Sequence, residues 1–142
     1  MIRDIRLSKI VQPNQEAVFF SKRIADEFGG TPSNNFKKYQ EMSPYSYSDT
    51  TQQSIKALIN TPIRLITEPD IQWRLKERCS DMYSLNAVDC SAVINELKRL
   101  GNKNAVLITT NNKGYRKPKN IRHPHSWSIA DPGETIKWLK SF

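Results

Sequence analysis

Two short apolar segments separated by a helical pattern constrain the fold of this chain most. Residues 63–67 and 105–110 are rich in β-branched and apolar side chains, as expected of buried strands. Between them, the apolar residues of 89–100 recur at helical spacing, and Gly101 ends the pattern. A strand, helix, strand order is nearly always a right-handed crossover between parallel strands. The sequence therefore predicts an α/β fold with two parallel strands and a crossover helix.

Several flanking helices are also expected. One covers about 14–28, a second begins near 31–34, and a third starts at Asp49 or Thr50 and includes Ile55, Leu58 and Ile59. A final helix follows Asp131, where a capping residue, a proline and an acid stand in the order typical of a helix start.

The size of the chain permits one domain. It has 142 residues and a mass of 16.4 kDa, which excludes two complete domains. Two strands do not make a doubly wound sheet, because such a sheet needs several strands covered on both faces. We therefore predict a single incomplete domain over 1–142. Residues 1–60 form a helical flanking segment, and residues 61–142 form a strand, helix, strand, helix unit.

Composition limits the classes of protein and of site. No apolar run approaches the ~18 residues needed to cross a bilayer, and the N-terminus has no continuous apolar region of a secretory signal. We expect a cytoplasmic protein without a membrane partner. Cys79 and Cys90 lack the CxxC spacing of a zinc site and do not form a disulfide framework, so no metal or other cofactor is predicted.

The chain is basic. Lysine and arginine number 22 against 14 acids, a net charge of +8, and residues 111–125 contain five of these bases and no acid. Such an excess admits an anionic partner. A small module that binds nucleic acid through Lys113 to Arg122 is therefore an alternative function, although basic loops are more often simply exposed, which makes nucleic acid the less expected partner.

Polar residues follow the ends of both predicted strands. Glu68 and Asp70 come after the first strand, and the two histidines of the chain, His123 and His125, follow the second. Ligands and catalytic groups in open α/β sheets collect outside the carboxyl ends of strands. A carboxylate at one strand end and an imidazole past the next can orient a general base.

These residues carry a resemblance to a known family. The stretch from Pro62 to Phe142 resembles the C-terminal half of an α/β-hydrolase: PIRLITEPD is similar to the strand and turn that carry the triad acid, and RHPHSWSIADPGETIKWL to the histidine loop and last helix. GGTPSNNFKKYQEMSPYS is similar to lid-like helices before the acid strand. The resemblance implies a partial α/β-hydrolase fold, with Asp70 as the acid and His125 as the histidine of a serine esterase or peptidase.

The sequence departs from this family at the nucleophile. No serine has glycine both two residues before and two residues after it, so the Gly-x-Ser-x-Gly turn that exposes the nucleophile is absent. We expect the C-terminal portion of a serine hydrolase that acts on small ester or peptide substrates and is inactive alone. Its expected partner is a complementary N-terminal fragment or a second copy, since the edges of a two-stranded sheet are open to pairing.

Other roles are open for the same residues. Asp70 could cap a helix beginning at Ile71, and Glu68 is the competing acid. His123 and His125 could hold a metal ion, but a third ligand is not evident. Cys90 is an alternative nucleophile, although its place at a helix start favours a buried and inert thiol.

Overall fold

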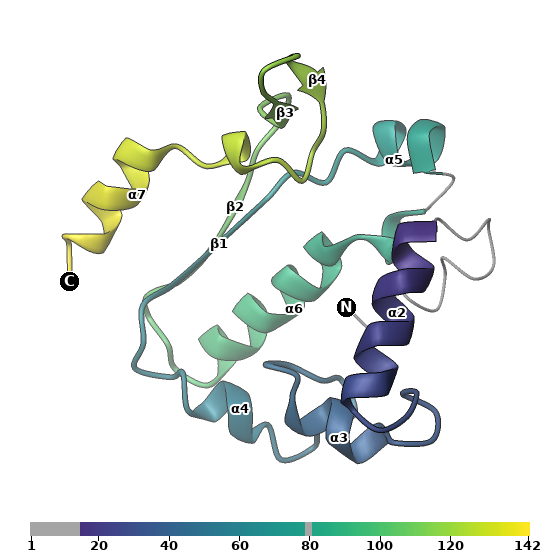
Figure 1. The fold of residues 1–142 in the computed structure, drawn as a ribbon. Helices are drawn as coiled ribbons and strands as arrows, with labels where there is room; N and C mark the ends of the chain where they lie inside the picture. Colours follow the sequence, from purple (N-terminus) through teal and green to yellow (C-terminus); the bar gives the residue numbers. More distant parts are fainter. Residues whose placement is uncertain (1–14, 79–80) are drawn as a thin grey trace.

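The computed structural model describes residues 15–78 and 81–142, and it has mixed helices and strands (Figure 1). The helices are α2 (Gln15–Glu27), α3 (Phe36–Glu41), α4 (Gln53–Lys56), α5 (Ile71–Arg78), α6 (Asn86–Arg99) and α7 (Pro132–Leu139). The strands are β1 (Ile63–Thr67), β2 (Ala105–Thr109), β3 (Tyr115–Arg116) and β4 (Ile121–Arg122). Asn14, the predicted start of the first helix, and Cys79 lie outside the described residues.

The predicted parallel sheet is confirmed. β1 and β2 pair in parallel, in a register that places Ile63 opposite Ala105 and Thr67 opposite Thr109. Helix α6 lies between them in the sequence and packs against both. The structure is thus a small α/β arrangement built on a two-stranded sheet.

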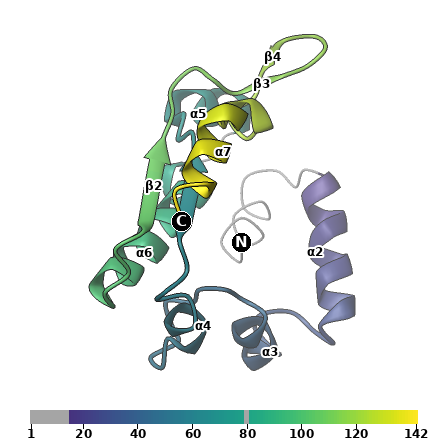
Figure 2. The same cartoon turned by 90° about the vertical axis from the view of Figure 1, so that its left-hand side faces the viewer.

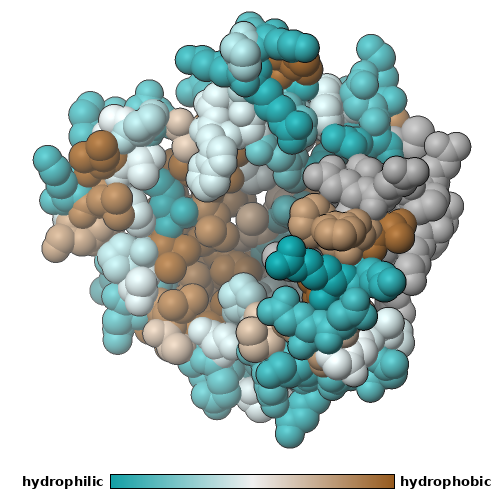
Figure 3. All heavy atoms as spheres, viewed as in Figure 1, coloured by the Kyte–Doolittle hydropathy of each residue, from teal (hydrophilic) through white to brown (hydrophobic). Residues whose placement is uncertain are grey.

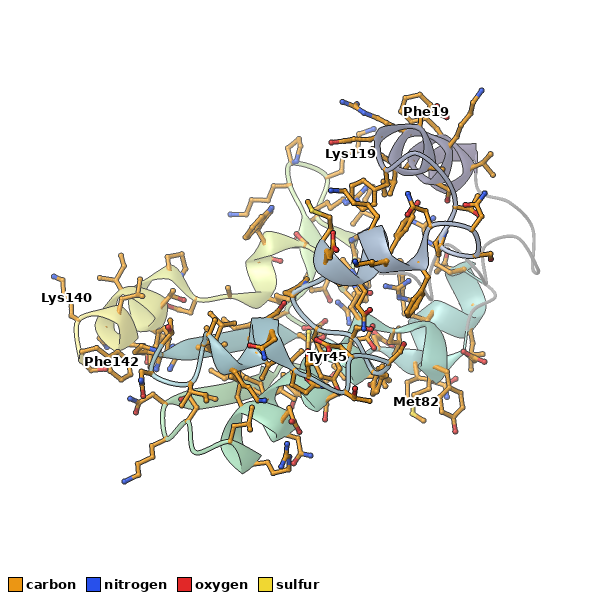
Figure 4. The ribbon with its side chains drawn as sticks, turned by 90° about the horizontal axis from the view of Figure 1, so that it is seen from below. Phe19, Tyr45, Met82, Lys119, Lys140 and Phe142 are labelled. Atoms are coloured by element: carbon orange, nitrogen blue, oxygen red, sulfur yellow. The ribbon has the colours of Figure 1, made fainter. Side chains whose placement is uncertain are left out.

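Helix α6 forms the core with one face of the sheet. Leu97 is fully buried and Ile94 nearly so, and both belong to one hydrophobic cluster with Ile55 of α4 and Ala105 of β2. The odd-numbered residues of β1 face this core, since alternate side chains of a strand point to opposite faces and Ile63 and Leu65 pack against the cluster. Tyr45, which is labelled in Figure 4, reaches the same cluster from the loop before α4.

Helix α7 lies on the other side of the sheet, in front of the strands in Figure 2. The guanidinium of Arg64 stacks 4.9 Å from the ring centroid of Trp138, and its Nη1 donates to the Glu134 carbonyl at 3.3 Å. The predicted start of this helix is confirmed, because Asp131 Oδ1 accepts a hydrogen bond from the Glu134 N–H at 2.9 Å. The final helix is therefore anchored both by its own cap and by β1.

The outer edge of β1 is unpaired in the described part of the chain. Ile63 N–H bonds to the Asn104 carbonyl and Thr110 N–H to the Thr67 carbonyl, so the odd-numbered residues direct their backbone groups toward β2. In a parallel pair the alternate residues face away, which leaves the N–H and C=O groups of Arg64 and Ile66 on the free edge. No β1 residue is fully buried, and hydrophobic residues line a hollow beside the strands in Figure 3.

The third predicted helix is shorter than expected. It ends at Lys56, and Leu58 and Ile59 lie in turns rather than in the helix. The reason is the buried side chain of Asn102, whose Nδ2 donates to the carbonyls of Leu58 and Thr61, each at 2.9 Å. The predicted cap is also wrong: Gln52, in a left-handed conformation, precedes the helix, and Asp49 Oδ1 accepts from the Thr51 N–H instead.

No helix within residues 15–78 and 81–142 combines the length and the apolar character that a membrane span requires.

Candidate functional site

A buried carboxylate lies where β1 and β2 end. Glu68 is 4% exposed. Its Oε2 accepts hydrogen bonds from the Thr110 hydroxyl at 2.8 Å and the Lys113 N–H at 2.9 Å. Its Oε1 accepts from the Gly114 N–H at 3.2 Å and forms an ion pair with Arg122. Burial opposes ionisation of this carboxyl, but these bonds outweigh burial and lower its pKa.

Arg122 joins this carboxylate to its neighbour. From β4, its Nη2 donates to Asp70 Oδ2 at 2.5 Å and its Nη1 donates to the Gly114 carbonyl at 2.8 Å. Its guanidinium also stacks 5.5 Å from the ring centroid of Tyr115. We call Glu68, Asp70, Gly114 and Arg122 the strand-end network, because it ties the ends of both parallel strands to the β3–β4 hairpin.

Asp70 has a structural task in addition to the ion pair. Its Oδ1 accepts a hydrogen bond from the Trp73 N–H at 3.0 Å, which is the geometry of a helix N-cap. The interpretation of Asp70 as the cap of the helix that begins at Ile71 is therefore confirmed. Both carboxylate oxygens of Asp70 are engaged, one by α5 and the other by Arg122.

His125 lies in a basic environment. Its Nε2 is in direct contact with the guanidinium of Arg74 in α5. Burial of the imidazole, together with the positive charges of Arg74, His123 and Arg78, lowers the pKa of His125 to about 4. The pKa of His123 is also lowered, first by burial and then by the charges of Arg116, Arg78 and Arg74. Both imidazoles are therefore neutral near pH 7.

The structure does not join Asp70 to His125. Asp70 bonds to Arg122 and to α5, whereas the imidazole of His125 contacts Arg74, one helical turn further along α5. A depression of about 430 Å³ opens at the carboxyl end of the sheet, and neither histidine lines it. Its lining residues are Glu68, Pro69, Asp70, Ile71, Gln72, Thr109, Thr110 and Asn111. The catalytic roles of Asp70 and His125 stay predictions.

The structure also bears on two other roles considered for these residues, Cys90 as a nucleophile and the histidines as metal ligands. Cys90 lies in α6 as a half-buried free thiol, and burial, with the charge of Asp89, raises its pKa, which disfavours a reactive thiolate. Among the described residues, no group of three or more histidine, cysteine or acidic side chains is placed to hold a metal ion.

Two residues of the site escaped sequence reasoning. Arg122 stood in a basic run that indicated an exposed loop, yet its side chain is only 19% exposed. Arg74 stood in a mixed-charge helix pattern typical of a solvated face, yet it contacts His125. One sequence signal pointed toward Arg122. Glu68 and Asp70 both follow the first strand, and two ionised carboxylates close together are stabilised by a nearby cation.

Comparison with known proteins identified no relative. No protein-family model, no curated protein and no solved structure matches this chain.

Proposed function

We propose that this chain is the C-terminal portion of an α/β-hydrolase-type serine hydrolase that acts in the cytoplasm on small esters or peptides. It supplies Asp70 and His125, and a separate segment or chain supplies the serine nucleophile and further strands. The single observation that carries the proposal is that no strand among the described residues pairs with the outer edge of β1.

The edge supports an incomplete sheet. Strands of a parallel sheet are normally flanked by others and buried on both faces, but no β1 residue here is fully buried although three of its five side chains are Ile or Leu. A strand added beside β1 would pair with the N–H and C=O groups of Arg64 and Ile66, which bond to no other strand within residues 15–78 and 81–142. It would also cover the hydrophobic hollow seen in Figure 3.

The positions of the two catalytic candidates suit this chemistry in part. Asp70 follows β1, and His125 lies beyond the next strand, as the family order of acid and histidine requires. In such a triad a serine attacks a carbonyl carbon, His125 takes the serine proton, and the acid stabilises the imidazolium. A carboxylate oxygen accepts more than one hydrogen bond, so Asp70 could retain its cap while turning an oxygen to His125.

The same geometry accounts for inactivity of the chain alone. The carboxylate is held by Arg122, and the imidazole is held neutral against Arg74. The proposal therefore places the formation of the Asp70–His125 contact in the completed domain.

The test is reconstitution with the protein segment encoded directly upstream. The two pieces are co-expressed, and hydrolysis of p-nitrophenyl butyrate is compared with that of each piece alone, with His125→Ala, and with Arg23→Gln as a control in exposed α2. We expect activity only in the pair, lost in His125→Ala and kept in Arg23→Gln.

Three results contradict the proposal. They are an upstream sequence without a Gly-x-Ser-x-Gly segment in any frame, a pair that forms but does not hydrolyse the ester, and a pair whose activity survives His125→Ala. Concentration-dependent self-association of the chain alone, measured by size exclusion, would instead identify a second copy as the partner of the β1 edge.

A further inference from the structure

Five basic side chains lie near Trp73 and His123, beside the strand-end network, since the His123 N–H bonds to the Gly114 carbonyl. The His123 ring lies 5.5 Å from the Trp73 ring and 6.3 Å from the His125 ring, between centroids, and the Arg78 guanidinium lies 5.8 Å from the Trp73 ring. Arg74 contacts His125, and the charge of Arg116 acts on His123. We call Arg74, Arg78, Arg116, His123 and His125 the basic cluster.

The acids whose partners the structure gives near the basic cluster bond to groups outside it. The carboxylates of Glu68 and Asp70 bond to Arg122 and to backbone N–H groups. Glu77 lies 3.7 Å from Lys76 Nζ on the exposed side of α5, and Arg74 and Asp81 each have further interactions. No described carboxylate accepts a hydrogen bond from either histidine, so the charge of the basic cluster is not balanced at the imidazoles.

His123 has an unmet hydrogen-bonding requirement within the described structure. The Nδ1 atom of His123 is shielded from solvent and has no hydrogen-bond partner in the described structure. A buried polar atom without a partner costs free energy comparable to a lost hydrogen bond. A ligand oxygen bound among these side chains would supply the acceptor.

We propose that the basic cluster binds a phosphate group. A phosphate offers several acceptor oxygens, and arginine forks match its geometry. Arg78 and Arg116 are both exposed and come from different elements, α5 and β3, so they can approach one anion from two sides. His123 and His125 complete the site, and each gains a favourable partner for its protonated form when the anion binds.

The site shares His125 with the proposed hydrolase function, but it forms within the chain alone and requires no nucleophile, so phosphate binding can be tested separately from hydrolysis. Binding should also draw protons into the site. The imidazoles are neutral near pH 7 in the free chain, and a bound dianion beside them raises their pKa values. Sulfate keeps its charge between pH 5 and 8, so sulfate affinity should rise as the pH falls in that range.

The test is an NMR titration of the whole chain with inorganic phosphate at constant ionic strength, following the ring resonances of the two histidines. We expect a saturable shift of both. Arg78→Gln and Arg116→Gln should each weaken binding about tenfold, the loss of one charged hydrogen bond. Arg23→Gln removes the same charge far along the chain and should leave binding unchanged.

Two further arms separate the sources of the phosphate. A nucleoside monophosphate and a short single-stranded oligonucleotide are titrated against the same resonances, and tighter binding of one identifies a phosphomonoester or a nucleic-acid backbone as the natural ligand. Chemical shifts that do not saturate with phosphate would overturn the proposal. An affinity that falls equally in Arg23→Gln and Arg78→Gln would do the same, because it would show only general screening of charge. The thermal midpoint of each variant checks that it is folded.

Discussion

Arg122 holds the carboxylate of Glu68 at the point where the two parallel strands end. The Glu68 side chain is 1% exposed and that of Arg122 is 19% exposed, so the ion pair is shielded from water. It links the end of β1 to β4, and the Thr110, Lys113 and Gly114 bonds to the same carboxylate add the end of β2 and the hairpin. This pair therefore fixes the geometry of the whole strand-end network.

Removing the arginine should destabilise the protein strongly. Breaking a buried pair leaves an uncompensated charge and costs about 3–5 kcal/mol, so Arg122→Met should lower the free energy of unfolding by that order. Lys137→Met is the matched control, because its pair with Glu134 is exposed on both sides and such pairs contribute about 0–1 kcal/mol. Urea unfolding measures both. Equal losses in the two variants would show that the strand-end network adds no stability.

The parts of the fold that could be predicted from the sequence are those that leave a local or periodic pattern in it. The periodicity of residues 63–67, 89–100 and 105–110 was sufficient for the parallel pair and α6, because burial on a strand or a helix face leaves a repeating pattern. The start of α7 was equally predictable, since Asp131 caps its helix through a local hydrogen bond.

The candidate site was less predictable, because it depends on contacts between distant residues. Asp70 was recognised both as an acid and as a cap, but its ion pair joins it to Arg122 across the whole β1–α6–β2 unit. The early end of α4 likewise depends on Asn102, which is far along the chain. The hairpin β3–β4, whose tip carries Lys119 in Figure 4, has strands of only two residues, too short for an alternating pattern.

The pH dependence of stability should reflect His125. The folded chain lowers the pKa of this imidazole from 6.5 to about 4, so between these values the unfolded chain binds the proton and the folded chain does not. Stability is therefore lost as the pH falls from 6.5 to 4. Urea midpoints across this range should fall less steeply in His125→Gln. An NMR titration of the wild-type ring with a midpoint at or above 6.5 would contradict the basic environment.

Gly114 should tolerate no side chain. A Cβ built there lies 2.6 Å from the His123 carbonyl oxygen and 2.7 Å from the Pro124 Cα, and both are backbone atoms that cannot move alone. Gly114→Ala should therefore displace the N–H that bonds to Glu68 and cost several kcal/mol. Gly101→Ala adds a methyl into open space at a φ of 100° and should cost only the backbone strain, about 1–2 kcal/mol. Urea unfolding that shows a larger loss of stability in Gly101→Ala than in Gly114→Ala would contradict this packing.

The free edge of β1 can be tested with proline. The N–H of Ile66 faces away from β2, so Ile66→Pro removes no sheet hydrogen bond and should leave the chain folded. The N–H of Leu65 faces β2, and Leu65→Pro should unfold it. In the reconstituted pair, Ile66→Pro should prevent association, which size exclusion measures. Normal association of this variant would show that the partner does not add a strand at β1.

The most direct test of the account is the rate of ester hydrolysis by the reconstituted pair. Each piece alone should hydrolyse p-nitrophenyl butyrate at the rate of the buffer, and the pair should exceed it. His125→Ala in the pair should return the rate to that of the buffer. Hydrolysis by the chain alone, or a pair as active with alanine at position 125 as with histidine, would contradict the claim that this chain contributes the imidazole of a divided hydrolase.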